Sequence, residues 1–86
     1  MRALFHKNFR KQYQKFHPSE KQRFKERRDI FLNDPFHAVL NNHALLGKYH
    51  GYRSINVTGD LRALYKLIGK DLALFVAIDR HSNLYR

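Results

Sequence analysis

Residues 52–78 decide the fold, and they read YRSINVTGDLRALYKLIGKDLALFVAI. Over most of this stretch apolar and polar side chains alternate, as they do in strands that bury one face. The last part, Leu72–Ile78, is nearly all apolar, which is typical of a central strand covered on both faces. Turn signals at Gly59-Asp60 and Gly69-Lys70-Asp71 separate the segments. The sequence therefore predicts an antiparallel meander of three strands.

A short strand and a first helix are predicted before this sheet. Residues Arg2–His6 are expected to form the strand. Aromatic residues then recur at helical spacing until His17-Pro18, where the helix should end because the residue before proline disfavours helical backbone. These aromatic residues, which we expect to form core, are Phe5, Phe9, Tyr13 and Phe16.

A second helix is predicted from Ser19 to Asn33. Ser19 is a candidate cap, with Gln22 completing a capping box, and Asn33-Asp34-Pro35 is a stop signal. The two helices would form an antiparallel hairpin over one face of the sheet, which leaves the other face open, polar and basic. The expected fold class is α+β, in which an N-terminal short strand and a helical hairpin pack on a small antiparallel β-sheet within a single domain, residues 1–86.

The charge balance points to a polyanionic partner. The chain of 86 residues holds 17 Lys and Arg against 7 Asp and Glu, a formal charge of +10. It has no cysteine, which excludes disulfides, zinc–thiolate sites and thiol nucleophiles. No apolar run approaches the ~20 residues of a membrane helix, and no signal peptide is recognisable. A cytoplasmic protein without a membrane partner is expected.

The inventory of side chains suits RNA cleavage without a cofactor. Neither a Gly-rich phosphate loop nor a metal-binding motif occurs, so no cofactor or metal is expected. RNA carries its own nucleophile, the 2′-OH, beside the scissile phosphate. Its cleavage needs a proton acceptor, a proton donor and positive charge on the transition state, roles that histidine, arginine and lysine fill near neutral pH. Aromatic rings suit stacking on a splayed base.

Four segments in the second half resemble a known family. They are His43-Ala44-Leu45-Leu46-Gly47, Gly51-Tyr52-Arg53, Asp60-Leu61-Arg62-Ala63-Leu64-Tyr65 and the terminal His81-x-x-Leu84-Tyr85. Their order and spacing are similar to those of the RelE/ParE superfamily of bacterial toxins, and specifically its YafQ-like mRNA interferases. The resemblance covers residues 43–86 well, whereas residues 1–42 match only in their pattern of a short strand and basic helices. It implies a RelE-like fold and a type II toxin of a toxin–antitoxin system.

The resemblance also implies an activity and partners. The expected protein is a ribosome-dependent, metal-independent endoribonuclease that cuts translated mRNA by 2′-OH attack and so inhibits translation. Its expected partners are the ribosome, mRNA and a cognate antitoxin; the sequence does not decide whether it forms a homo-oligomer. The matched catalytic positions are His43, Asp60, His81 and Tyr85. His81 would be the general acid or base and His43 its counterpart, Asp60 a base or an orienting group, and Tyr85 a contact to base or phosphate.

Phosphate binding is expected from four cations. Arg53 and Arg62 would lie on the open face with Lys48 nearby. Where some relatives have a second histidine this chain has Asn56, and Ala77 replaces a basic residue of the last strand. Arg80 is therefore expected to supply the missing charge.

Other interpretations remain open. His43 has a structural interpretation as a loop residue, Asp60 as a hairpin-turn residue and Tyr85 as a plug at the chain end. A ParE-like toxin that inhibits DNA gyrase without enzymatic activity is a second hypothesis, although that branch generally lacks a histidine like His81. A basic nucleic-acid-binding module is a third, and it predicts salt-sensitive binding without cleavage.

Overall fold

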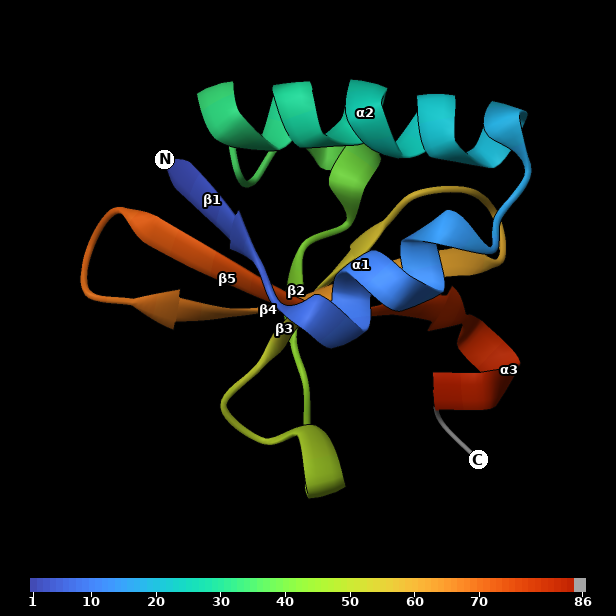
Figure 1. Ribbon diagram of the computed structural model, residues 1–86. Helices are drawn as coiled ribbons and strands as arrows, with labels where there is room; N and C mark the ends of the chain where they lie inside the picture. Colours follow the sequence, from blue (N-terminus) through green and yellow to red (C-terminus); the bar gives the residue numbers. More distant parts are fainter. Residues whose placement is uncertain (85–86) are drawn as a thin grey trace.

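The structure is a computed structural model that describes residues 1–84, and its centre is a five-stranded sheet in the order β1-β5-β4-β3-β2 (Figure 1). The strands are β1 Arg2–Phe5, β2 His43–Ala44, β3 Arg53–Asn56, β4 Leu61–Ile68 and β5 Leu72–Arg80. β1 runs parallel to β5, and the other three pairs are antiparallel. The predicted meander is therefore confirmed, and it gains one strand at each edge.

Helices α1, Lys7–Gln14, and α2, Pro18–Asn33, lie on one side of the sheet (Figure 1). A short helix α3, His81–Leu84, continues from β5, and two 3₁₀ turns, η1 Ala38–Leu40 and η2 Gly47–Tyr49, lie in the connections. The expected fold class, α+β with helices on a mostly antiparallel sheet, is confirmed.

The start of α2 differs from the prediction. The N-cap is His17, one residue before Pro18, and not Ser19. Proline suits the first helical position because its missing N–H would have no partner there. Glu20 completes the cap, since the His17 backbone N–H donates to Glu20 Oε1 over 3.2 Å. The Ser19 prediction was wrong because proline takes the first position of the helix.

The core between the helices and the sheet is aromatic. Phe31, Tyr65 and Phe75 are fully buried, and Phe9 and Phe24 nearly so. Their rings meet at 4.9 Å between Phe31 and Tyr65 and 5.4 Å between Phe31 and Phe75. Burial of each such side chain contributes roughly 1.5–3 kcal/mol, and edge-to-face ring pairs add to this. Of the four aromatic residues expected to form core, Phe9 is buried in it, and Phe5, Tyr13 and Phe16 are partly buried against it.

A β-bulge changes the phase of β5. Leu64 pairs with Ala77 but Tyr65 pairs with Phe75, so Val76 is an extra residue on β5. Side chains alternate across a strand, and one extra residue exchanges the two faces for everything that follows. Phe75 and Ile78 consequently both reach the aromatic core although they are three residues apart.

The face away from α1 and α2 is not wholly polar. Leu45, Leu64 and Leu84 form a second small core there. Tyr49, Tyr52, Val76 and Ala77 pack against them. The expectation of an open, polar and basic face was wrong in this part, because α3 and the segment around η2 fold over it. A pocket beside this cluster remains accessible on this face.

Candidate active site

One pocket, of about 390 Å³, is lined by Asn41, His43, Leu45, Arg62 and His81. His43 lies in β2, Arg62 lies in β4, and His81 is the first residue of α3, directly after β5. Strand register explains the gathering: Ser54 pairs with both His43 and Leu64, and Leu64 is two residues from Arg62 on the same face. Two histidines and an arginine from distant parts of the chain therefore share one hollow.

His43 is held by one ring nitrogen. Its Nδ1 lies 2.8 Å from the carbonyl oxygen of Asn41. A carbonyl only accepts hydrogen bonds, so this contact places the proton on Nδ1. In the neutral ring the lone pair is then on Nε2. That tautomer suits His43 to accept a proton at Nε2, in the manner of a histidine oriented by a backbone group.

Asn41 owes this role to its backbone. Its φ of 44° makes it the one residue other than glycine with positive φ among residues 1–84. Asparagine tolerates this left-handed conformation better than most residues. Asn41 ends η1, and it turns the chain into β2 so that its carbonyl meets the ring of His43. The sequence motifs did not single out Asn41, although asparagine is one of the residues that a left-handed turn position favours.

His81 is fixed through its backbone. Its N–H donates to the carbonyl oxygen of Asp60 over 2.8 Å, which ties the start of α3 to the β3–β4 turn. His81 is exposed and lines the pocket together with His43 and Arg62. Its position at the end of a strand is therefore set by two segments of chain.

Arg62 is the cation of the pocket. Its Nη1 donates to the carbonyl oxygens of Thr58, at 2.9 Å, and Leu61, at 3.1 Å, and its Nη2 to that of Gly59, at 3.2 Å. These acceptors are neutral, and Arg62 forms no ion pair with a carboxylate of residues 1–84. The guanidinium is thereby fixed while its charge stays available to an anion.

Arg53 lies outside the pocket, on the face that carries α2. It pairs with Tyr65 whereas Asn56 pairs with Arg62, and residues 53 and 56 point to opposite faces. Arg53 Nε donates to Asn42 Oδ1 over 2.8 Å, and its guanidinium lies 5.2 Å from the ring of Phe36. The expectation that Arg53 and Arg62 share one open face was wrong.

Arg80 also lies on the helix side. Its Nη1 is 2.6 Å from Glu20 Oε2, and the bulge at Val76 is the reason it faces that way. The Asp60 carboxylate lies 3.9 Å from Arg80 Nε and does not line the pocket. The backbone carbonyl of Asp60 accepts a hydrogen bond from the N–H of His81.

The remaining predicted residues divide as follows. Lys48 lies in η2, with its Nζ 5.2 Å from the ring centre of Tyr49, and it does not line the pocket. Asn56 is directly opposite Arg62, and Ala77 is opposite Leu64. Tyr85 lies outside the described residues.

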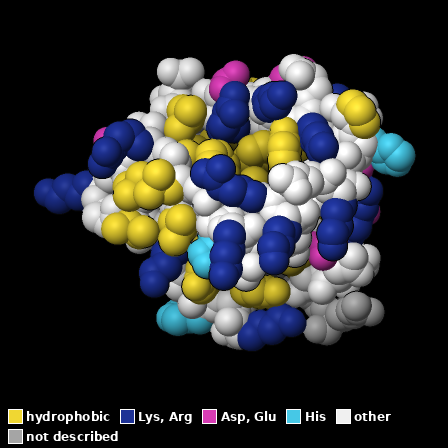
Figure 2. Space-filling model, viewed as in Figure 1, with side chains coloured by type: hydrophobic (Ala, Val, Ile, Leu, Met, Phe, Trp, Pro, Cys, Tyr) yellow, Lys and Arg dark blue, Asp and Glu magenta, His cyan; other side chains and the backbone are white. Residues whose placement is uncertain are grey.

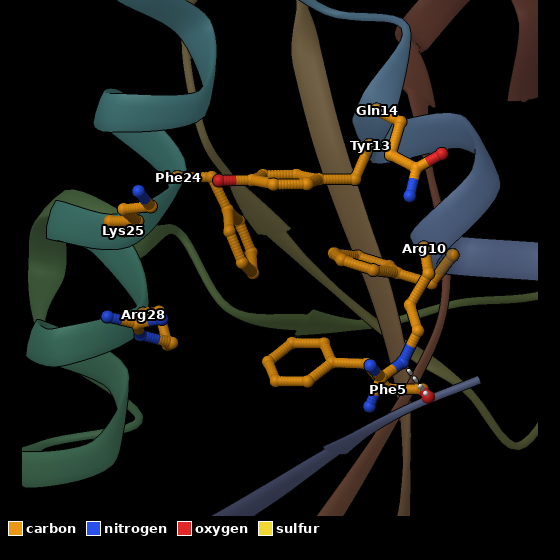
Figure 3. Close-up of a pocket in the computed structure, with 8 residues that line it drawn as sticks. Phe5, Arg10, Tyr13, Gln14, Phe24, Lys25 and Arg28 are labelled. Atoms are coloured by element: carbon orange, nitrogen blue, oxygen red, sulfur yellow. Dashed lines mark hydrogen bonds between the residues drawn. The ribbon is translucent and has the colours of Figure 1, made fainter. Parts of the chain in front are cut away.

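A second hollow, of about 370 Å³, opens between α1 and α2. Its walls are the rings of Phe5, Phe9, Tyr13 and Phe24, with Gln14 at one end (Figure 3). Arg10 on α1 stands across the rings from Lys25 and Arg28 on α2 (Figure 3). Figure 2 shows Lys and Arg side chains gathered around hydrophobic surface on this side of the molecule. The hollow therefore combines an aromatic wall with a cationic rim.

The part of the chain that the structure describes holds neither a metal-binding cluster nor a helix that could span a membrane. Across residues 1–84 no group of three or more His, Cys, Asp or Glu side chains lies together as a metal site would require. None of the helices within that range is both long enough and apolar enough to cross a membrane.

Comparison with known proteins places this arrangement in a family. The fold matches that of YafQ from E. coli with a TM-score of 0.81, 25% identity and 100% of both chains covered. YafQ in the E. coli DinJ–YafQ complex matches with a TM-score of 0.78, 27% identity and 100% of both chains. The chain belongs to the RelE/ParE toxin superfamily. Within it the chain is YafQ-like, as the sequence motifs indicated.

More distant RelE/ParE toxins share the fold. A YoeB/ParE toxin from Agrobacterium tumefaciens matches with a TM-score of 0.78 at 18% identity, over 94% of this chain and 99% of that one. No protein-family model matches the sequence, and no curated protein matches it either. Membership of the RelE/ParE superfamily therefore rests on the fold together with the motifs.

Proposed function

We propose that the protein is an endoribonuclease toxin that cuts translated mRNA in the ribosome. The observation that carries this proposal is the joint position of His43, Arg62 and His81 in one pocket of a strongly basic chain. Two imidazoles can transfer the protons of a 2′-OH attack on a phosphodiester, and a guanidinium that forms no ion pair within residues 1–84 can stabilise its charge. Tyr85 remains a predicted contact to base or phosphate.

The geometry suggests how the two histidines divide the work. His43, with its proton on Nδ1, takes the 2′-OH proton at Nε2. The 2′ oxygen then attacks phosphorus and forms a cyclic phosphate, while the bond to the 5′ oxygen breaks. Protonated His81 donates a proton to that leaving oxygen, so protons and charge balance. Each proton transfer of this kind is worth about 10²–10⁴-fold in rate.

Arg62 would stabilise the charge that develops on the phosphoryl oxygens. Removal of one such donor typically costs about 10²–10³-fold in kcat. Arg53 and Arg80 are not part of this mechanism, because their guanidinium groups are engaged on the helix side. The pocket is lined by five residues, so the ribosome would supply much of the positioning of the message.

The proposal includes a cognate antitoxin. YafQ relatives have been crystallised in the DinJ–YafQ toxin–antitoxin complex. The hollow between α1 and α2 offers apolar rings ringed by Arg10, Lys25 and Arg28, which suits an acidic amphipathic segment. Antitoxin binding there, or over the basic surface, would keep the toxin from the ribosome.

The test is expression without antitoxin, with cut sites mapped by primer extension on a translated message. His81→Ala should lower cleavage by about 10²–10⁴-fold and relieve growth arrest. The control is His50→Ala, an exposed histidine that does not line the pocket. Undiminished mRNA cleavage by His81→Ala would refute the mechanism. Growth arrest with intact mRNA and inhibited DNA supercoiling would support the gyrase hypothesis instead.

A further inference from the structure

The last part of the strand that leads to His81, residues 76–80, is held by the sheet on one side only. β1 pairs with β5 as far as Phe75, so residues 76–80 form an edge strand next to β4. On that edge the backbone N–H of Ile78 donates to Gln12 Oε1 of α1 over 3.1 Å. An edge has few restraints of its own. The side-chain contacts made there therefore fix the position of the end of β5 and, with it, the position of His81.

Arg80 makes the shortest of these contacts. Its Nη1 lies 2.6 Å from Glu20 Oε2, and its Nε lies 3.9 Å from Asp60 Oδ2. The guanidinium also lies 5.4 Å from the ring centre of Phe16. Charged hydrogen bonds of this length are about twice as strong as neutral ones. Arg80 therefore ties the end of β5 to the first turn of α2 and to the β3–β4 turn.

Glu20 is itself well fixed. Its other carboxylate oxygen accepts the His17 backbone N–H over 3.2 Å, so both oxygens are engaged. Its side chain is 16% exposed, against 56% for Glu26 in the Arg23 pair of the same helix. The hydrogen bond from Arg80, more than any other contact, lowers the pKa of Glu20, which keeps the carboxylate charged at neutral pH.

We propose that Glu20 is a positioning residue for His81 and acts through Arg80. This inference rests on the proposed function, in which His81 transfers a proton. Glu20 does not line the pocket, so it has no contact with the reacting phosphate there. Arg80 directly precedes His81 in the chain. The backbone N–H of His81 donates to the carbonyl oxygen of Asp60 over 2.8 Å. A displaced Arg80 would shift both ends of that connection.

Glu20→Gln tests the proposal on the full chain. Glutamine keeps an oxygen for the His17 N–H and so preserves the helix cap, but it removes the charge that holds Arg80. We expect kcat for ribosome-bound cleavage to fall about tenfold to hundredfold with KM unchanged, because small misplacements of a catalytic group have effects of that order. The matched control is Glu26→Gln, which removes the same charge from an exposed pair and should leave kcat unchanged.

A second readout does not depend on nuclease activity. In histidine-labelled protein, the NMR signals of the His81 ring should move in Glu20→Gln and stay in place in Glu26→Gln. If the parent protein cleaves no RNA, the proposed function fails while the NMR comparison still decides the positioning role. Parent-like kcat together with unmoved His81 signals in Glu20→Gln would overturn the inference.

The route through Arg80 has its own test. Glu20→Gln combined with Arg80→Gln should be no slower than Arg80→Gln alone, because residues that act through one contact are not additive. Additive losses in the double variant would refute that route. If Glu20→Gln fails to fold, Arg80→Lys replaces it: the lysine keeps the charge but loses the fork that reaches Glu20 and Asp60 together, so its His81 signals should move.

Discussion

The two faces of the sheet use arginine in opposite ways. On the helix side, Arg80 is paired with Glu20 and lies near Asp60, so its charge is largely neutralised and serves to join segments. On the pocket side, Arg62 is held by three neutral carbonyl oxygens and keeps its charge for another molecule. The comparison teaches that the groups which hold a cation decide whether it serves structure or binding.

The largest effect expected from this comparison is on stability. Phe31 is fully buried on the helix side, so Phe31→Ala should lower the free energy of unfolding by about 3–5 kcal/mol. His81→Ala, at an exposed position on the pocket side, should change it by no more than about 0.5 kcal/mol. Urea unfolding followed by circular dichroism measures both. Equal losses would show that the two faces do not divide stability and chemistry.

The next effect concerns Arg62. Arg62→Gln should reduce kcat for ribosome-bound mRNA by about 10²–10³-fold, because it removes the charge that faces the developing anion. Arg53→Gln is the matched control on the other face, and its larger consequence should be for stability through the lost Asn42 contact. A greater loss of kcat in Arg53→Gln than in Arg62→Gln would contradict the assignment of the faces.

A smaller effect is expected at Asn41. At φ 44°, alanine lacks the short polar side chain that lets asparagine adopt the left-handed backbone, so Asn41→Ala should lower the free energy of unfolding by about 1 kcal/mol. Asn41→Gly should not lower it, because glycine adopts this backbone without strain. Both variants keep the carbonyl that holds His43, so chemical denaturation separates backbone strain from any role of the asparagine side chain.

The smallest effect is a contribution of Glu20 to stability that should disappear in acid. The pKa of Glu20 is lowered in the folded chain, chiefly by the hydrogen bond from Arg80. The ionised carboxylate therefore contributes stability above its ordinary pKa of 4.5, and this contribution is lost as pH falls through the lower folded value. The stability difference between the parent and Glu20→Gln should shrink from pH 7 to pH 2. In an Arg80→Gln background, the same substitution should show little of this pH dependence.

Much of the fold was predictable because its signals are periodic. The alternation along residues 52–67 and the aromatic spacing of the first helix each mark one face of an element as apolar. Burial of such faces is the main favourable contribution to the free energy of folding. The two-residue strand at His43 and the four-residue helix at His81 have no period to detect. They form only because Leu45 and Leu84 bury themselves against Leu64.

The site was predictable in part. His43, Arg62 and His81 were expected from the motifs, and the structure brings them together. The face of Arg53 was wrong although the alternation of its own strand already indicated it, because Arg53 is in phase with Ile55 and Val57, which lie in the core on the helix side. The face on which Arg80 lies depends on the bulge at Val76. The sequence does not reveal this bulge, because Leu72–Ile78 is nearly all apolar and has no alternation that an extra residue would interrupt.

Because Val76 is an extra residue, the faces on which the last residues of β5 lie depend on the exact number of residues in this strand. A strand shortened by one residue at this point would exchange Asp79 and Arg80 between the faces. A second guanidinium would then enter the pocket, and α2 would meet a carboxylate in place of its cation. A one-residue deletion at Val76 would therefore alter the charge of the pocket without any substitution among the residues that line it.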